Sequence, residues 1–185
     1  MLFPAFYDFC CRVKIVSGLN ALEKIPGMLK KMKAQAPLII TDAGVAGAGL
    51  VDVVKEALAG QLEMVAVYDR VPVDSDYKVV DEAAKIYRQK KCDSIIAVGG
   101  GSVIDTAKGA NIVASLGGNT LLDYEGFAAV KRKLNPLVVI PTTAGTGSEM
   151  TLVAVIADPD RKIKMLFVSY FVLPDLAMLD GRMTK

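Results

Sequence analysis

The feature that most constrains the fold is a short apolar run that leads through three consecutive glycines into a helical pattern. Residues 94–98 read SIIAV, which is typical of a buried strand. Residues 99–101 are all glycine, and residues 103–116 predict a helix that ends at the glycine pair 117–118. Because glycine has no Cβ, a ligand can approach the backbone of such a turn closely. The segment therefore predicts a strand-to-helix turn open to a ligand; a turn that needs its glycines for packing alone is the alternative.

The start of this helix is predicted to bind an anion. Ser102 and Asp105 have the spacing of a capping box, which places them in the first helical turn. Backbone N–H groups without carbonyl partners and the positive end of the helix dipole favour a phosphate there. For Asp105, a structural role as a cap stays open beside ligand binding. Lys108 lies one turn further along the same face, where it would pair with Asp105 or meet a phosphate.

Apolar runs alternate with helical patterns along most of the chain. We expect strands at residues 12–16, 37–42, 63–68, 94–98 and 137–140. Helices are expected at 20–33, with a disturbance near Pro26-Gly27, and at 50–58, 76–90 and 103–116. This alternation predicts an α/β fold of the Rossmann-like, doubly wound type, with a mainly parallel sheet covered by helices on both faces. Apolar runs at 152–157 and 163–168 flank an Asp-Pro-Asp sequence and predict a β-hairpin near the C-terminus. No linker interrupts residues 1–185, so a single domain is expected.

The composition argues against several classes of function. The 22 basic and 20 acidic residues are interspersed, so they form neither a basic stripe for nucleic acid nor a membrane-binding face. No apolar run is long enough to cross a bilayer, and the first residues lack the basic region of a signal peptide, so a cytoplasmic location is expected. A hydrophobic content of 52% is high for a monomer. We therefore expect a second domain or a homo-oligomer to cover apolar surface.

Cysteine and histidine usage limits the chemistry. Cys10, Cys11 and Cys92 are odd in number and form no C-x-x-C motif, so reduced thiols are expected. Histidine is absent from the sequence. Because histidine is the commonest metal ligand and general acid–base residue, chemistry that needs it must use residues outside these 185.

Polar or glycine-rich segments follow three of the predicted strands. Asp42 ends one strand, the glycine turn follows the second, and residues 142–148 follow the third. Because ligands of parallel sheets bind beyond the carboxyl ends of the strands, we expect these segments to converge on a nucleotide-sized site. Capping of a local turn is the alternative role for Asp42, and capping of loop backbone groups is the alternative for one or more threonine hydroxyls.

Two standard phosphate-binding fingerprints fail. No glycine is followed by Lys and Ser or Thr in the frame of a P-loop. The dinucleotide fingerprint G-x-G-x-x-G would need glycine at Ile104, and its acidic residue would lie about 20 residues downstream. The candidate acid, Asp42, lies upstream instead. A dinucleotide would therefore bind in a variant layout, with its ribose on Asp42 and its pyrophosphate on residues 100–102.

Two longer motifs together carry a family resemblance. GGGSVIDTAKG at 99–109, followed by PTTAGTGSEMT at 141–151, resembles the iron-containing (group III) alcohol dehydrogenases of the dehydroquinate synthase-like superfamily. The resemblance covers nearly the whole chain. It implies an N-terminal nucleotide domain, the cofactor NAD or alternatively NADP, and a divalent metal, iron or zinc. In that family the metal is held by an aspartate and three histidines of a helical C-terminal domain.

The resemblance also implies which residues contact the cofactor. It places the adenosine ribose at Asp42, the pyrophosphate at 99–102, and the nicotinamide half along 142–148, with Lys164 reaching in from the hairpin. The candidate cofactor-binding residues are Asp42, Gly99, Gly100, Gly101, Ser102, Asp105, Thr142, Thr143, Thr146, Ser148 and Lys164. Many members carry asparagine where this chain has Val73 and Val153. No catalytic residue and no metal ligand are expected within the chain.

The resulting hypothesis is the dinucleotide-binding domain of a two-domain, metal-dependent alcohol dehydrogenase. The intact enzyme would transfer a hydride between nicotinamide and a small alcohol or aldehyde, and residues 1–185 alone would be inactive. Because Asp42 would repel a 2′-phosphate, NAD is favoured over NADP. The alternatives are the cofactor domain of a glycerol or glycerol-phosphate dehydrogenase, a maleylacetate reductase or a dehydroquinate synthase, and a non-catalytic nucleotide-binding module.

Overall fold

A parallel sheet with two wholly buried central strands organises the molecule. The computed structural model describes residues 11–62, 65–127 and 129–184. Its main sheet has the order β1-β9-β6-β4-β2-β3, and every neighbouring pair is parallel. The strands are β1 (Lys14–Ser17), β2 (Pro37–Ile40), β3 (Ala66–Tyr68), β4 (Ser94–Gly99), β6 (Leu137–Pro141) and β9 (Leu176–Leu179). All side chains of β2 and β4 are buried, as expected for strands covered on both faces.

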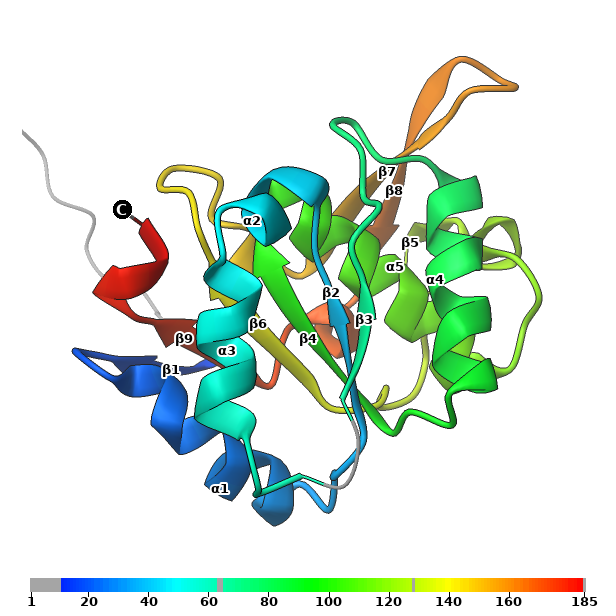
Figure 1. Ribbon diagram of the computed structural model, residues 1–185. Helices are drawn as coiled ribbons and strands as arrows, with labels where there is room; N and C mark the ends of the chain where they lie inside the picture. The colour runs from blue at the N-terminus through cyan, green and yellow to red at the C-terminus, as the bar shows by residue number, and fades with distance from the viewer. Residues whose placement is uncertain (1–10, 63–64, 128, 185) are drawn as a thin grey trace, which may run out of the picture.

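Helices cover the two faces of this sheet in separate groups (Figure 1). The helices are α1 (Ile25–Lys31), α2 (Ala43–Gly47), α3 (Leu50–Leu58), α4 (Tyr77–Gln89) and α5 (Gly101–Leu116). Side chains of α4 and α5 pack with Leu38 and Ile40 of β2, whereas side chains of α1 and α3 pack with Ile39. Because successive strand residues point to opposite faces, one strand contributes to both cores. The Rossmann-like α/β fold is therefore as predicted.

Helix α5 is the most deeply buried helix of the described chain. Every residue from 103 to 113 is buried, because α5 lies between the main sheet, α4 and a second, smaller sheet. The approach to α4 is close at Gly109, where a Cβ would lie 3.0 Å from Val80 Cγ1. The helix ends at Gly117, whose left-handed conformation lets its N–H donate to the Val113 carbonyl. The predicted C-terminal end of this helix is confirmed.

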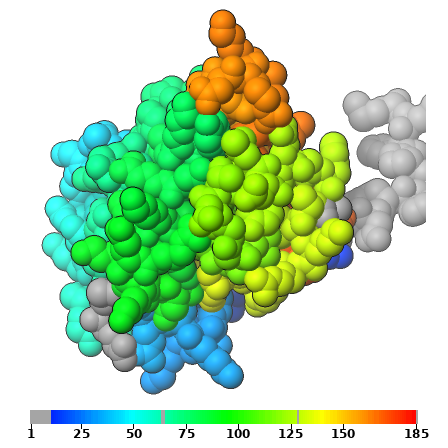
Figure 2. Space-filling model, turned by 90° about the vertical axis from the view of Figure 1, so that its right-hand side faces the viewer, coloured from blue at the N-terminus to red at the C-terminus, as the bar shows by residue number. Residues whose placement is uncertain are grey.

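The smaller sheet has the order β5-β8-β7 and contains the predicted hairpin. Strands β7 (Val153–Asp158) and β8 (Ile163–Val168) are antiparallel, and β5 (Gly126–Phe127) pairs parallel to β8. The inner face of the hairpin packs on the α4–α5 side of the molecule through four buried side chains, Ala154, Ile156, Met165 and Phe167. Figure 2 shows the tip of the hairpin rising above α4 and the loop that follows α5.

The structure departs from the sequence prediction in several elements; α2 and β5, for example, were not among the predicted ones. Strand β9 was not predicted, although it lies inside the sheet between β1 and β6. The helix expected at 20–33 is divided into a 3-10 turn, η1 (Ala21–Lys24), and α1, because Pro26 occupies the first turn of a new helix. Strand β3 is shorter than predicted, and residues 63–64 of the prediction lie outside the described residues.

Two smaller expectations can be compared with the described residues. Cys11 and Cys92 are free thiols, and burial raises the pKa of Cys92 to about 11. Cys10 lies outside the described residues. None of the helices within those residues is long and apolar enough to cross a bilayer.

Asp180 connects the end of β9 to the 3-10 turn η1. This buried carboxylate accepts hydrogen bonds from the Arg182 guanidinium at 2.8 and 3.0 Å and from the Leu22 backbone N–H at 3.4 Å. The hydrogen bonds from Arg182 lower the pKa of Asp180 from 3.8 to about 2. A depressed pKa means that the ionised carboxylate stabilises the folded state. That stabilisation is complete above about pH 4 and is lost as the pH falls toward about 2.

We predict that Asp180→Asn lowers the free energy of unfolding at pH 7 by about 2 kcal/mol, because the shift of the Asp180 pKa corresponds to an energy of that size. Urea unfolding at pH 7, 4 and 2.5 measures the effect. The difference between wild type and variant should shrink as the pH falls below 4. Asp52→Asn, at an exposed carboxylate on α3, is the control and should have little effect. A difference that does not depend on pH would contradict this account.

Candidate functional site

The segments expected to converge do so at the carboxyl ends of β2, β4 and β6. A cavity of about 520 Å³ lies there and is lined by the start of α2, the loop at 71–73, the beginning of α5 and residues 142–143. In Figure 1 these segments lie at the upper edge of the sheet. Of the predicted site residues, six line this cavity: Asp42, Gly100, Gly101, Ser102, Thr142 and Thr143. We call this the rim cavity.

The glycine turn (residues 99–102) meets the loop that follows β6 in close contact. A Cβ on Gly100 would lie 3.1 Å from Thr143 Oγ1, and one on Gly101 would lie 3.2 Å from Thr146 Cγ2. At Gly99 a Cβ would lie only 2.6 Å from Val103 Cγ2. Packing therefore requires glycine at 99, whereas a Cβ at 100 or 101 would make a tight contact that Thr143 or Thr146 would have to relieve by a small shift. The packing role raised from the sequence is real and coexists with an opening toward the rim cavity.

The N-terminus of α5 carries no side-chain cap. Its N-cap residue is Gly100, which has no side chain to accept a hydrogen bond from the first turn. The N–H groups of the first helical turn have no intrahelical carbonyl acceptor, so they favour an anion, as does the helix dipole. With Gly100, Gly101 and Ser102 lining the cavity, this end of the helix can bind a phosphate group.

The predicted capping box is wrong. Ser102 lies inside the helix, one residue beyond its first position. Asp105 does not reach back to the helix start, because its carboxylate is used elsewhere: Oδ1 accepts a hydrogen bond from Ser148 Oγ at 3.0 Å, and Oδ2 accepts one from the Val155 N–H at 3.1 Å. Burial raises the pKa of Asp105. Asp105 thus connects α5 to the following loop and to β7, and its contact with a cofactor stays a prediction.

Lys108 also differs from expectation. It was expected to pair with Asp105 or to meet a phosphate, yet its fully buried ammonium donates to the Thr151 carbonyl at 2.8 Å, to Thr151 Oγ1 at 3.1 Å and to the Val153 carbonyl at 2.7 Å. Burial lowers the pKa of Lys108 to about 8, an effect that the negative charges of Asp105 and Glu149 oppose.

The threonine loop (residues 142–151) divides into a cavity-lining part and a supporting part. Its first N–H, from Thr142, donates to the Gly99 carbonyl at 3.1 Å and so continues the contact between β6 and β4. Thr142 and Thr143 line the rim cavity. Thr146 packs against Gly101, and Ser148 donates to Asp105. These last two residues hold the loop in place and do not line the rim cavity.

Asp42 is at once a helix cap and a cavity residue. Its Oδ1 accepts a hydrogen bond from the Val45 N–H at 2.8 Å, so Asp42 is the N-cap of α2 and the capping alternative is confirmed. Among the residues that the structure describes, no donor reaches Oδ2. That second oxygen can accept hydrogen bonds from a ligand in the rim cavity, so the two roles are compatible.

Lys164 does not line the rim cavity. Its ammonium pairs with Asp74 Oδ1 at 3.0 Å, and both side chains are largely exposed. The pair borders a smaller cavity of about 190 Å³, which Ser102 and Asp105 also line. Ser75 also lines this cavity, and its buried hydroxyl has no hydrogen-bond partner among the residues that the structure describes.

Several residues of this region were not among the predicted site residues. Val45 contributes the capped N–H of α2, and Asp74 and Ser75 line the smaller cavity. The available signal was the one used for the other segments, because residues 69–75 follow the carboxyl end of β3 in the same parallel sheet.

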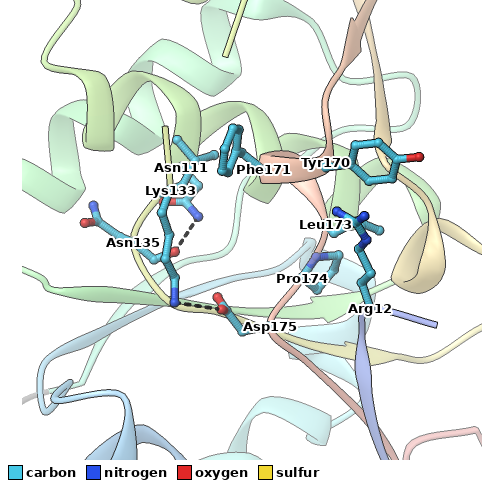
Figure 3. Close-up of a pocket in the computed structure, with 10 residues that line it drawn as sticks. Arg12, Asn111, Lys133, Asn135, Tyr170, Phe171, Leu173, Pro174 and Asp175 are labelled. Carbon is cyan, nitrogen blue, oxygen red and sulfur yellow. Dashed lines mark hydrogen bonds and ion pairs between the residues drawn. The ribbon is translucent and has the colours of Figure 1, made fainter. Parts of the chain in front are cut away.

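A second cavity lies at the opposite, amino-terminal edge of the sheet, near the start of β6 and β9 (Figure 3). Its volume is about 230 Å³. Arg12 lies 4.1 Å from the centre of the Tyr170 ring, and Lys133 pairs with Asp175 at 3.6 Å. None of the predicted site residues lines this cavity. The chemistry expected from the sequence therefore concentrates at the rim cavity.

Comparison with known proteins identifies similar chains. Residues 13–181 match the family described as iron-containing alcohol dehydrogenase. The NAD-dependent methanol dehydrogenase of Bacillus methanolicus is 37% identical over 165 residues, which are 89% of this chain and 43% of that protein. A 1,3-propanediol oxidoreductase structure superposes with a TM-score of 0.90 at 30% identity, covering 97% of this chain and 47% of the other.

A sulfoacetaldehyde reductase from Bifidobacterium kashiwanohense, solved in complex with NAD+, superposes with a TM-score of 0.85 at 27% identity. The alignment covers 98% of this chain and 48% of the reductase. The chain thus spans about half the length of the relatives that it matches.

The close packing at the glycine turn predicts a large difference between two glycine substitutions. Gly99→Ala should lower the free energy of unfolding by about 1–3 kcal/mol, because the new methyl group overlaps Val103. Gly27→Ala, inside α1 with open space around the new Cβ, should raise it by about 0.5–1 kcal/mol. Urea unfolding of both variants compares them, and equal stabilities would argue against a packing requirement at Gly99.

Proposed function

This chain belongs to the iron-containing alcohol dehydrogenase family, and from that premise we propose that it binds the nicotinamide dinucleotide of a dehydrogenase in the rim cavity. The observation that carries the proposal is the uncapped start of α5, which meets the cavity at Gly100 and lies across it from Asp42. A phosphate-binding helix end and a carboxylate that can accept ribose hydroxyls are the two contacts that a dinucleotide needs most.

The proposed pose runs along the carboxyl edge of the sheet. The pyrophosphate lies on the first turn of α5, at residues 100–102, and the adenosine ribose donates its hydroxyls to Asp42 Oδ2. The nicotinamide half extends past Thr142 and Thr143. Lys164 approaches the cofactor from the hairpin, and ligand binding then draws its ammonium away from Asp74. The apolar loop at 71–73, which lines the cavity, packs against a base.

NAD is the proposed cofactor. The methanol dehydrogenase relative is named for its dependence on NAD, and the similar reductase was solved with NAD+. Asp42 favours the same cofactor, because its carboxylate repels the 2′-phosphate of NADP.

We further propose that residues 1–185 act as the cofactor-binding half of an enzyme that transfers hydride between nicotinamide and a small alcohol or aldehyde. The bound dinucleotide supplies the hydride chemistry. The residues of this chain bind the pyrophosphate, orient the ribose and place the nicotinamide along the threonine loop. The family name implies iron, but within residues 11–62, 65–127 and 129–184 no three His, Cys, Asp or Glu side chains gather to hold a metal ion. The described residues do not fit a metal site, and we derive no step through one.

We predict that the chain binds NAD more tightly than NADP. Asp42→Gly should change the ratio of the two dissociation constants in favour of NADP by about tenfold or more, because the substitution removes the charge that repels a 2′-phosphate. Glycine is also an acceptable N-cap, so α2 should lose only a few tenths of a kcal/mol. Calorimetric titration with each dinucleotide measures the ratio of the two dissociation constants.

Two controls make the result interpretable. Asp42→Asn keeps an N-cap side chain and removes the charge, so it should move the ratio in the same direction. Asp52→Asn, on the exposed side of α3, should leave it unchanged. Absence of binding by wild type at millimolar concentrations of either dinucleotide would refute the proposed function, and an unchanged ratio in both Asp42 variants would remove Asp42 from the ribose site.

A further inference from the structure

Lys108 is a fully buried cation whose entire hydrogen-bonding capacity is used by one segment of the chain. A lysine ammonium has three donors and no acceptor. Here the three acceptors are the carbonyl and hydroxyl of Thr151 and the carbonyl of Val153, all between 2.7 and 3.1 Å from Nζ. No carboxylate of the described residues lies within ion-pair distance of it. Burying a cation among neutral partners costs free energy, so packing alone does not explain a lysine at position 108.

One face of α5 carries three consecutive attachments to the segment that follows β6. Gly101, Asp105 and Lys108 are spaced by four and three residues, so they lie in a row along the helix. Gly101 packs on Thr146, halfway along the threonine loop. Asp105 accepts from Ser148 in its middle, and Lys108 donates to Thr151 at its end.

This row attaches the loop that contains Thr143, which lines the rim cavity, and Thr146, which packs on Gly101. The threonine loop is tied at its first residue by the Thr142 N–H, which donates to Gly99, and at its last residue by Lys108. Between these two points the loop contains Gly145 and Gly147 in left-handed conformations, which give its backbone little intrinsic rigidity. Release of the Lys108 end would leave the hydrogen bond from Ser148 to Asp105 to hold the later part of the loop, so Thr143 and Thr146 would be held less firmly against the glycine turn.

We propose that Lys108 is a positioning residue for the dinucleotide site: its ammonium holds the far end of the threonine loop and thereby keeps Thr143 and Thr146 seated on the glycine turn. The residue does not touch the ligand and acts through the loop. The expected effect of Lys108 on dinucleotide binding rests on the proposed function. Its expected effect on the threonine loop does not depend on any ligand.

The charge state of Lys108 gives the proposal a pH signature. Burial lowers the pKa of Lys108 to about 8, while Asp105 on α5 and Glu149 in the threonine loop, the charged groups that act on it, favour the ammonium. A neutral amine has two N–H donors for three oxygen acceptors. One acceptor therefore loses its partner above about pH 8, and the loop should loosen.

The experiment compares Lys108→Met with Lys55→Met, a matched substitution at a lysine on α3 whose side chain is half exposed. Hydrogen exchange without ligand should show lower protection factors at residues 142–151 in Lys108→Met, with β2 and β4 unchanged. NAD should bind Lys108→Met about tenfold more weakly, the effect expected when hydrogen bonds to a charged group are lost. Lys55→Met should match wild type in both measurements.

A pH series separates positioning from a merely structural role. Between pH 7 and 9.5, two wild-type quantities should fall several-fold: the NAD affinity and the protection factors at 142–151, after correction for intrinsic exchange. Lys108→Met should show neither change. The wild-type series decides the matter if Lys108→Met does not fold. Unchanged loop protection across the series, or a folded Lys108→Met with wild-type protection and affinity, would overturn the proposal. If wild type binds no dinucleotide, the proposed function fails, and loop protection alone still decides the role of Lys108.

Discussion

The burial of α5 on all sides is the constraint on which the rest of the structure depends. Because the sheet, α4 and the hairpin all pack on this one helix, its axis and its first residue are fixed relative to the strand ends. The uncapped N-terminus therefore lies at a defined place on the rim, between Asp42 and the threonine loop. Glycine at 99 lets the strand turn into the helix without collision, and glycines at 100 and 101 let the threonine loop pack closely on the turn.

Much of the fold and of the cavity lining could be predicted, because both follow from local patterns. Apolar runs in alternation with helical segments identify the strands and helices, and in a parallel sheet their carboxyl ends must share one edge. Asp42, Gly100, Thr142 and Thr143 could therefore be placed together although they are far apart in the sequence. The family match agrees with the fold, since a solved relative superposes closely on most of this chain.

The remaining features depend on tertiary contacts that no local pattern encodes. Asp105 and Lys108 were assigned to a capping box and to a phosphate or an ion pair, because those are the partners that spacing suggests. Their actual partners lie 43 to 50 residues later and reach α5 only after the threonine loop and β7 have packed on it. Strand β9 was missed for the same reason. Four apolar residues at 176–179 become a strand only because β1 and β6 leave a gap between them.

The position of β9 has a consequence for how the chain is made. In the sheet of the described residues β1 is an edge strand, and its neighbour is β9, which comes from a much later part of the sequence, residues 176–179. During synthesis the β2, β3 and β4 region can assemble from contiguous sequence, but β1 stays without a partner until 176–179 leave the ribosome. Such a long-range pairing adds loop-closure entropy and slows folding. Truncation upstream of β9 would leave two strand edges, on β1 and β6, open to pairing with other chains.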